Sequence, residues 1–348
     1  MKKNILITSI GGHFSHDLIR SLKSDKSVYI IGTDINYTNN SYYIDKFLKV
    51  PDPRKNSDKF MMNLLNICKR YKINFVLPCS ENECIIVSKL SKKFKKLNIK
   101  TSVSDYEIVK KLVDKHKLFR FLDEKKINVG MWNKINTIKE LNTIAKKLGY
   151  PKKKLVLKPR KGSGSKGVII LDSRKINFEY LLTDKKRFCG TGSITALKSE
   201  IKKDKRNIFN YIIMPYYNKK TFDVDCLAKD GEMKLCVPRL RIYQNPLSAI
   251  NEGCMIINEK SIQNYCKKII KALNIDGVCD FDIILKNNKE PKIIDASCRL
   301  SGSATASLAA GINIPQKLIN LLSGKNLKNT FVKKKQLVFP QNRFELVK

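Results

Sequence analysis

Apolar runs and amphipathic segments alternate along the first hundred residues. Short apolar runs that end in polar or glycine-containing turns predict buried strands at residues 4–10, 27–35 and 73–79. Apolar side chains that recur every three or four positions predict helices at residues 16–24, 57–71 and 83–97. This alternation is typical of a doubly wound unit with a parallel sheet. We therefore expect an N-terminal α/β domain over residues 1–104.

A long helical pattern at residues 104–126 follows this domain. Ser104 and Glu107 predict a capping box at its start. After a further predicted helix at residues 137–150, residues 153–171 read as a strand, a glycine-rich loop and a second strand. We expect a second region over residues 105–213, made of the linker helix and this hairpin.

Strand patterns return in the last third of the chain. Residues 221–243 alternate around Asp230-Gly231, a dipeptide that favours a two-residue hairpin turn. Another predicted strand pair, residues 278–285 and 291–300, encloses a polar turn, and a helical pattern runs from 303 to 324. We expect a third region over residues 214–325 and a basic tail over residues 326–348.

The glycine-rich loop carries the first candidate chemistry. Lys158 lies on the strand that enters the loop and supplies a fixed cation. Small and hydroxyl side chains let backbone N–H groups turn toward a polyanion, and they comprise Gly162, Ser163, Gly164, Ser165 and Gly167. The pattern differs from a Walker A loop, which leads into a helix rather than a strand. A surface hairpin with chance lysines explains the same residues, so the loop alone leaves both interpretations open.

Acidic side chains interrupt the last predicted strand pair. Asp280 and Asp282 share one strand face, and Asp295, Ser297 and Arg299 share a face on the partner strand. Neighbouring antiparallel strands would bring these carboxylates to about 5 Å from each other, where they repel. A bound Mg²⁺ is the usual resolution of such repulsion. A structural ion pair between one acid and Arg299 is the alternative.

The hairpin at residues 221–243 repeats this arrangement. Asp223 and Asp225 share a face of one strand, and Arg239 and Arg241 share a face of the other. A salt-bridged surface and a substrate site explain these four residues equally well.

Charge and cysteine content narrow the functional classes. The net charge is +38, and 57 of the 69 basic residues are lysines spread through every segment. This spread favours a compositional bias over a nucleic-acid interface, which concentrates arginine and aromatic residues on one patch. The ten cysteines contain no CxxC pair, so the sequence predicts reduced, buried thiols of a cytoplasmic protein rather than a zinc site. The N-terminal apolar run stops at Gly11-Gly12, and we expect no membrane segment.

The motifs in their order resemble one known family. Asp114-Lys115 is followed by the loop at residues 157–168, the strand end at 214–217, the hairpin at 222–231 and the acidic strands at 277–285 and 293–303. Over residues 1–325 the chain resembles the ATP-grasp superfamily, in its branch similar to carbamoyl-phosphate synthetase and amino-acid ligases. The resemblance implies a Rossmann-like pre-ATP-grasp domain, then a two-part α+β ATP-grasp fold with a lid subdomain and a C-terminal catalytic subdomain.

The resemblance also implies roles for individual residues. Lys115 and Lys158 would bind ATP phosphates under the mobile loop at 161–167, and Met214, Pro215 and Tyr216 would meet the adenine through backbone groups. Asp282, Asp295 and Ser297 would bind metal. Arg299 would steady the transferred phosphoryl group, and Arg241 would bind the substrate carboxylate or acyl phosphate.

The activity implied is ligation of a small carboxylate, such as an amino acid or sugar acid, to an amine, with ATP consumed through an acyl phosphate. The expected cofactors are ATP and one or two Mg²⁺ ions, for which Mn²⁺ is expected to substitute. A homodimer is compatible with this expectation.

Asp295 and Ser297 stand where the family usually has Glu and Asn. An ATP-binding protein without ligase turnover therefore stays an alternative, as does a basic nucleic-acid-binding protein. A dehydrogenase is disfavoured because residues 9–15 lack the GxGxxG spacing.

Overall fold

The computed structural model describes residues 2–12, 15–162, 164, 166–181, 189–204, 210–217, 220–242, 253–286, 290–327 and 335–341. The chain forms two compact units. Unit 1 comprises Met1–Leu112, Thr221–Tyr243 and Ile250–Lys348, and unit 2 comprises Val113–Lys220 and Gln244–Ala249. The domain boundaries expected at residues 104, 213 and 325 stay predictions.

The N-terminal part of unit 1 is the expected doubly wound domain. Its five strands are all parallel, in the order β3-β2-β1-β4-β5. The strands are β1 (Lys3–Thr8), β2 (Val28–Asp34), β3 (Lys46–Lys49), β4 (Phe75–Pro78) and β5 (Lys100–Thr101). The helices are α1 (Ser15–Lys23), α2 (Ser57–Arg70), α3 (Glu81–Lys89), α4 (Ser91–Lys96) and α5 (Tyr106–Leu112), with a 3₁₀ turn at Asn39–Tyr43. Fully buried Ile5, Leu6 and Ile7 place β1 at the centre of the core.

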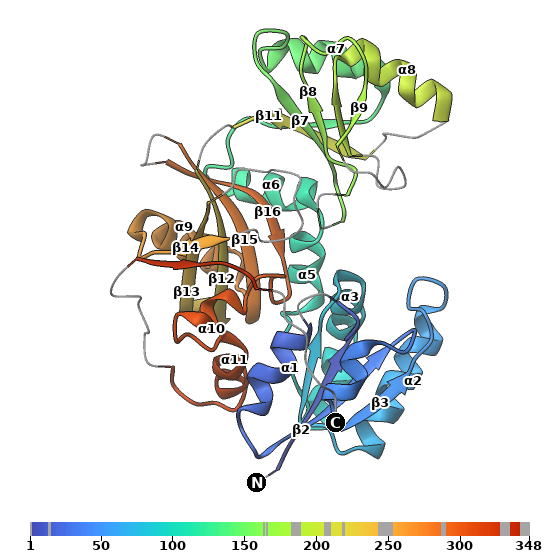
Figure 1. Ribbon diagram of the computed structural model, residues 1–348, viewed down its shortest axis with the longest axis vertical. Helices are drawn as coiled ribbons and strands as arrows, with labels where there is room; N and C mark the ends of the chain where they lie inside the picture. Colours follow the sequence, from blue (N-terminus) through green and yellow to red (C-terminus); the bar gives the residue numbers. More distant parts are fainter. Residues whose placement is uncertain are drawn as a thin grey trace. The chain divides into compact units, whose positions relative to one another are not determined.

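A second sheet completes unit 1, in the strand order β16-β15-β12-β13-β14-β17 (Figure 1). Its strands are β12 (Lys220–Lys229), β13 (Glu232–Arg241), β14 (Cys254–Ile256), β15 (Gly277–Lys286), β16 (Glu290–Ser297) and β17 (Gln336–Val338). The accompanying helices are α9 (Lys260–Leu273), α10 (Ala306–Ala309) and α11 (Ile314–Leu322). Both predicted hairpins are confirmed. Asp230 and Gly231 take φ of 50° and 73°, the positive values that a type I′ turn requires.

Unit 2 is built on a sheet of order β6-β11-β7-β8-β10-β9. Its strands are β6 (Asn133–Ile135), β7 (Leu155–Pro159), β8 (Ile169–Leu171), β9 (Glu179–Tyr180), β10 (Gly190–Gly192) and β11 (Tyr211–Pro215). Its helices are α6 (Lys115–Glu124), α7 (Ile138–Lys147) and α8 (Ile194–Asp204). Strands β7 and β8 pair antiparallel, which confirms the predicted strand, loop and strand at 153–171.

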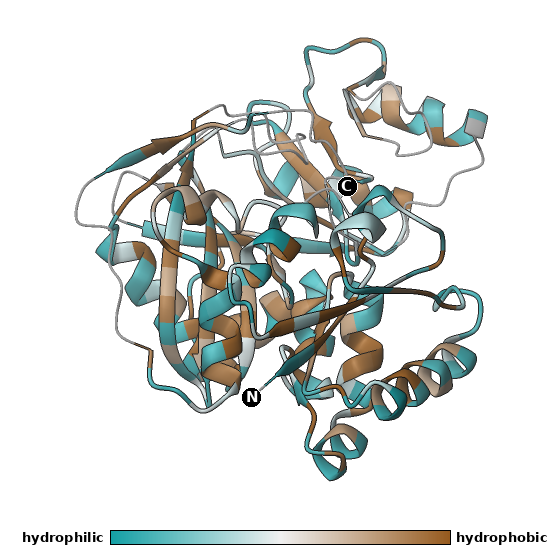
Figure 2. Ribbon diagram, turned by 60° about the horizontal axis from the view of Figure 1, so that its bottom comes forward, coloured by the Kyte–Doolittle hydropathy of each residue, from teal (hydrophilic) through white to brown (hydrophobic). Residues whose placement is uncertain are grey.

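The single long helix expected over residues 104–126 is wrong. Two helices, α5 and α6, take its place because Asp114 adopts an extended conformation and accepts hydrogen bonds from the N–H groups of His116 and Lys117. Ser104 exchanges hydrogen bonds with the backbone of Asp276 instead of closing a capping box. Figure 2 shows the amphipathic character of the helices and the mostly hydrophobic strands. None of the described helices is long and apolar enough to cross a membrane.

Candidate active site

The acids predicted to face each other do so on the second sheet of unit 1. Asp282 on β15 pairs in register with Asp295 on β16, and Asp280 pairs with Ser297. On the other side of β15, strand β12 carries Asp223, which accepts a hydrogen bond of 2.9 Å from Nε of Arg241. Nη2 of Arg241 lies 3.2 Å from Oδ1 of Asp282. Three strands, β12, β15 and β16, therefore contribute acidic side chains to one row, and β13 brings Arg241 to it.

The electrostatics of this row favour a cation. Burial raises the pKa of Asp282 to about 7, against the lowering effect of Arg241 and with further raising by Asp223 and Asp295. Burial and the charge of Asp225 also hold the pKa of Asp280 well above its ordinary value. Burial and mutual repulsion make it unfavourable to ionise these carboxylates together. A cation bound among them would stabilise their ionised forms.

Unpartnered oxygens lie in the same place. Within the part of the chain that the structure describes, Oδ1 of Asp280 and Oγ of Ser297 are buried and have no hydrogen-bond partner. Together with Asp282 and Asp295 they form a donor set of oxygen atoms only. Oxygen-only sets of carboxylates and neutral oxygens suit hard cations such as Mg²⁺, so the residues present fit the metal implied by the resemblance.

A second polar row is fully buried. Arg239 and Asp225 are both 0% exposed, and Nη2 of Arg239 lies 2.5 Å from Oδ2 of Asp225. Arg239 also donates to Oγ of Ser301 at 2.8 Å and to the backbone and hydroxyl of Ser303. The ion pairs weighed for this hairpin are thus formed, but of the two alternatives the salt-bridged surface is wrong, because Arg239, Asp225 and Asp223 are buried. Ser301 and Ser303 had no distinguishing sequence signal beyond their place after Arg299.

Arg299 follows β16 on the loop that Arg239 holds. It is half-buried, and its Nη1 donates to the backbone oxygen of Leu300 at 2.8 Å. The sequence suggested an ion pair between Arg299 and one of these acids. In the structure, Arg241 forms such an ion pair with Asp282. The role of Arg299 in steadying a phosphoryl group stays a prediction.

Unit 2 brings one lysine to the glycine-rich loop. Lys115 is 5% exposed at the start of α6, and its Nζ donates to the backbone oxygen of Gly162 at 3.0 Å. Asp114 accepts hydrogen bonds from Nε and Nη2 of Arg160 at 3.1 and 2.7 Å. These contacts join the Asp114-Lys115 motif to the loop although 46 residues separate Asp114 from Arg160. No local pattern singled out Arg160, because its partner is distant along the chain.

The other expected nucleotide residues lie along β7 and β11. Lys158 is half-buried on β7, opposite Ile212 of β11. Met214 pairs with Val156 and Pro215 with Leu155, and the N–H of Tyr216 donates to the backbone oxygen of Lys154 at 3.0 Å. Lys158 therefore lies three residues along β7, about 10 Å, from Leu155, the residue that pairs with Pro215.

The glycine-rich loop has a backbone that favours glycine. Gly162, Gly164 and Gly167 all take positive φ, and a Cβ at Gly167 would lie 2.7 Å from Pro159. Ser163 and Ser165 lie outside the described residues.

The N-terminal domain offers a separate buried acid, at the carboxyl ends of β1 and β4. Glu83 is 2% exposed and accepts hydrogen bonds from the hydroxyls of Thr8 at 2.7 Å and Ser80 at 2.9 Å. Burial raises the pKa of Glu83. Beside it, the N–H of Gly11 donates to Asp34 at 2.9 Å. Ligands of open α/β sheets bind at such strand ends.

Two family matches cover most of the chain between them. Residues 208–343 match the family described as "ATP-grasp in the biosynthetic pathway with Ter operon". Residues 5–102 match the family described as "PylC-like, N-terminal domain". Over 237 residues the chain is 22% identical to the Multifunctional protein URA2 of Saccharomyces cerevisiae, a match that covers 65% of this chain and 10% of that protein. The chain thus corresponds to about a tenth of the length of this curated relative.

Solved structures share the fold. The N5-carboxyaminoimidazole synthetase from Staphylococcus aureus complexed with ADP has a TM-score of 0.70 at 15% identity, over 94% of this chain and 80% of that one. The L-amino acid ligase from Bacillus licheniformis has a TM-score of 0.65 at 15% identity, over 92% and 74%. The biotin carboxylase domain of 2-oxoglutarate carboxylase from Hydrogenobacter thermophilus, in complex with MgADP, ADP and bicarbonate, has a TM-score of 0.69 at 13% identity, over 95% and 72%. The fold expected from the sequence is confirmed.

Proposed function

Because this chain is a member of the ATP-grasp superfamily, we propose that it is an ATP- and Mg²⁺-dependent carboxylate-amine ligase that works through an acyl phosphate. The observation that supports the proposal most is the oxygen-only donor set of Asp282, Asp295 and Ser297, which has Arg241 at 3.2 Å from one of its carboxylates. A cation and an arginine side by side suit a reaction in which negative charge moves between a phosphate and a carboxylate.

The proposed division of labour follows the two units. In unit 2, Lys115 and Lys158 bind ATP phosphates beneath the loop that contains Gly162, Gly164 and Gly167. Lys115 is pre-positioned for this task because its ammonium already contacts the loop backbone at Gly162. The backbone at Met214 to Tyr216 binds the adenine.

In unit 1, Arg241 orients the substrate carboxylate or the acyl phosphate, and Arg299 stabilises charge on the transferring phosphoryl group. Asp282, Asp295 and Ser297 would hold one or two Mg²⁺ ions, with Mn²⁺ as a substitute, and the metal would neutralise phosphate charge when bound. The chemistry needs little proton transfer, so no histidine or cysteine base is required. The substrate carboxylate belongs to a small molecule such as an amino acid or sugar acid, and the nucleophile is an amine.

ADP release in the presence of pooled carboxylates and amines tests the proposal. We expect release to require Mg²⁺, a carboxylate and an amine together. Asp295→Asn should reduce it by about a hundredfold or more, because a lost metal ligand raises the barrier by several kcal/mol. Asp276→Asn is the matched control, since the Asp276 side chain is 41% exposed and accepts a hydrogen bond from Lys229.

The second candidate is an ATP-binding protein without turnover. The ion pair between Arg241 and Asp282 favours it, because this pair engages one of the metal carboxylates. Calorimetric ATP binding that persists while no acid and amine pair yields ADP would favour this candidate and contradict the ligase. Absence of both binding and turnover would contradict both.

A further inference from the structure

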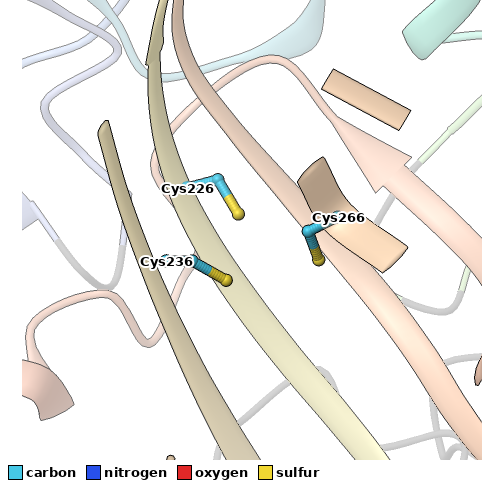
Figure 3. Close-up of side chains that lie close together, drawn as sticks. All are labelled: Cys226, Cys236 and Cys266. Atoms are coloured by element: carbon cyan, nitrogen blue, oxygen red, sulfur yellow. The ribbon is translucent and has the colours of Figure 1, made fainter. Parts of the chain in front are cut away.

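Three cysteines converge on the face of the second sheet that faces away from the acids. Cys226 on β12 lies directly opposite Cys236 on β13, and Cys266 projects from α9. Their sulfur atoms all lie within 4.8 Å of one another, and Figure 3 shows the side chains gathered between the strands and the helix. All three residues are buried.

Strand alternation explains why thiols and acids are separated. Asp225 and Cys226 are adjacent on β12, and Asp280 and Cys279 are adjacent on β15, so their side chains point to opposite faces. Helix α9 packs against β13, β15 and β16, and its buried residues include Tyr265, Cys266 and Ile269. The thiols therefore lie between sheet and helix, behind the proposed active site and distinct from it.

The distances suit a metal ion. With a metal–sulfur bond of about 2.3 Å, tetrahedral or trigonal geometry places ligand sulfurs about 3.8–4.0 Å apart. Sulfur atoms already within 4.8 Å of one another need to move by about an ångström or less. Such sulfur sets select Zn²⁺ and Cu⁺ over hard cations. We propose that Cys226, Cys236 and Cys266 form a binding site for a thiophilic d¹⁰ metal ion, Zn²⁺ or Cu⁺.

A fourth cysteine, Cys279, lies near Cys226. The Cys279 thiol interacts with that of Cys226 from the neighbouring strand β15. Three sulfurs complete a trigonal site for Cu⁺, whereas Zn²⁺ takes four ligands, and Cys279, whose sulfur is not within 4.8 Å of all three others, would have to move closer to serve as the fourth. Loss of Cys279 therefore distinguishes the two ions.

The burial of these cysteines determines when a metal ion can bind. Because Cys226 and Cys266 are 0% exposed, the ion enters during folding rather than through an open channel. Burial raises the pKa of the Cys226 thiol to about 11, so the metal-free site is protonated at neutral pH and metal uptake releases protons. The absence of a CxxC pair hid this site from the sequence, since its ligands come from separate strands and a helix.

Metal content and refolding test this proposal. The full chain is purified without oxygen, washed with EDTA, and its zinc and copper are measured by mass spectrometry. It is also refolded from denaturant with ZnCl₂ alone, with stabilised Cu⁺ alone, or with neither. We expect close to one equivalent of bound metal after refolding with one of the two ions, and a higher melting temperature than after refolding without metal. Refolding with Co²⁺ should give thiolate-to-cobalt charge-transfer absorption.

Variants make the test specific. Cys226→Ala and Cys266→Ala should each lower bound metal about tenfold or more. Cys68→Ala is the control, because Cys68 is buried in α2 outside the cluster, and it should keep full occupancy. Cys279→Ala should remove Zn²⁺ but retain Cu⁺. Metal content no higher than in the cysteine variants would overturn the proposal, as would a Cys226–Cys236 disulfide in the purified protein. If Cys226→Ala does not fold, the presence or absence of thiolate-to-cobalt absorption in the unmodified chain tests the proposal instead.

Discussion

The buried ion pair between Arg239 and Asp225 gives the sharpest test of the structure. Substitution of Arg239 by methionine keeps much of the side-chain volume and removes the charge. Asp225 would then be a carboxylate with 0% exposure that still accepts hydrogen bonds from the N–H and hydroxyl of Ser301 but has lost its cation. Asp223 and Asp280, which lie close enough to influence Arg239, would also lose a compensating charge.

The magnitude follows from burial. Removal of one partner of a buried ion pair typically destabilises a protein by about 3–5 kcal/mol, because the other charge is left without compensation. Native domains have only about 5–15 kcal/mol of stability, so we expect a large shift of the unfolding curve of unit 1. The double variant Arg239→Met with Asp225→Asn removes both charges, and it should be more stable than Arg239→Met alone by about 0.5–3 kcal/mol.

Urea unfolding of the single and double variants, followed by circular dichroism, measures these differences. Arg54→Met is the matched control in unit 1, because Arg54 is 64% exposed in its ion pair with Asp52 and its loss should leave the unfolding curve nearly unchanged. If Arg239→Met were destabilised no more than Arg54→Met, the conclusion that Arg239 is a buried, paired charge would be refuted.

Three further predictions concern the loop, the pH response and the backbone. Lys158→Ala should weaken ATP binding about ten- to a hundredfold, the equivalent of a charge-assisted contact worth about 1.5–3 kcal/mol, with the exposed Lys152→Ala as calorimetric control. Burial alone would raise the pKa of Asp114, but the hydrogen bonds and charge of Arg160 hold it below the ordinary value. Its contribution to stability is therefore present above pH about 4 and is lost as the pH falls further, so the unfolding curves of the unmodified chain and Asp114→Asn should converge in acid. Gly277 takes a φ of +89°, and a Cβ there would lie 2.2 Å from the backbone oxygen of Ser102, whereas Gly311, with a φ of +75°, has nothing within 4 Å. Thermal unfolding should show Gly277→Ala more destabilised than Gly311→Ala, which carries only a conformational cost of about 1–2 kcal/mol, and equal effects would contradict the close approach.

Much of this fold was determined by local sequence patterns. Period-two alternation and the Asp230-Gly231 turn predict that β12 and β13 form a hairpin, because the two strands are contiguous, whereas a register shift between Leu227 and Ala228 sets the pairing of the residues beyond it. Alternation also predicted acidic side chains facing each other across β15 and β16, and a register shift between Asp282 and Ile283 brings Asp282 opposite Asp295. The glycines at 162, 164 and 167 predicted a loop between two strands, and all three take positive φ in a loop that joins β7 to β8.

Tertiary structure decided the features that depend on pairing between distant segments. Strand β15 lies beside β12, its neighbour in the sheet but not in the sequence, and this pairing joins two acidic faces into one row and brings Cys279 to Cys226. The contacts of Lys115 with Gly162 and of Arg160 with Asp114 likewise cross more than forty residues. Local periodicity shows which face of a strand a side chain occupies, but not which strand or helix will cover that face. That choice depends on the packing of the whole unit, which is why Arg239 proved buried and why the cysteine cluster was not expected.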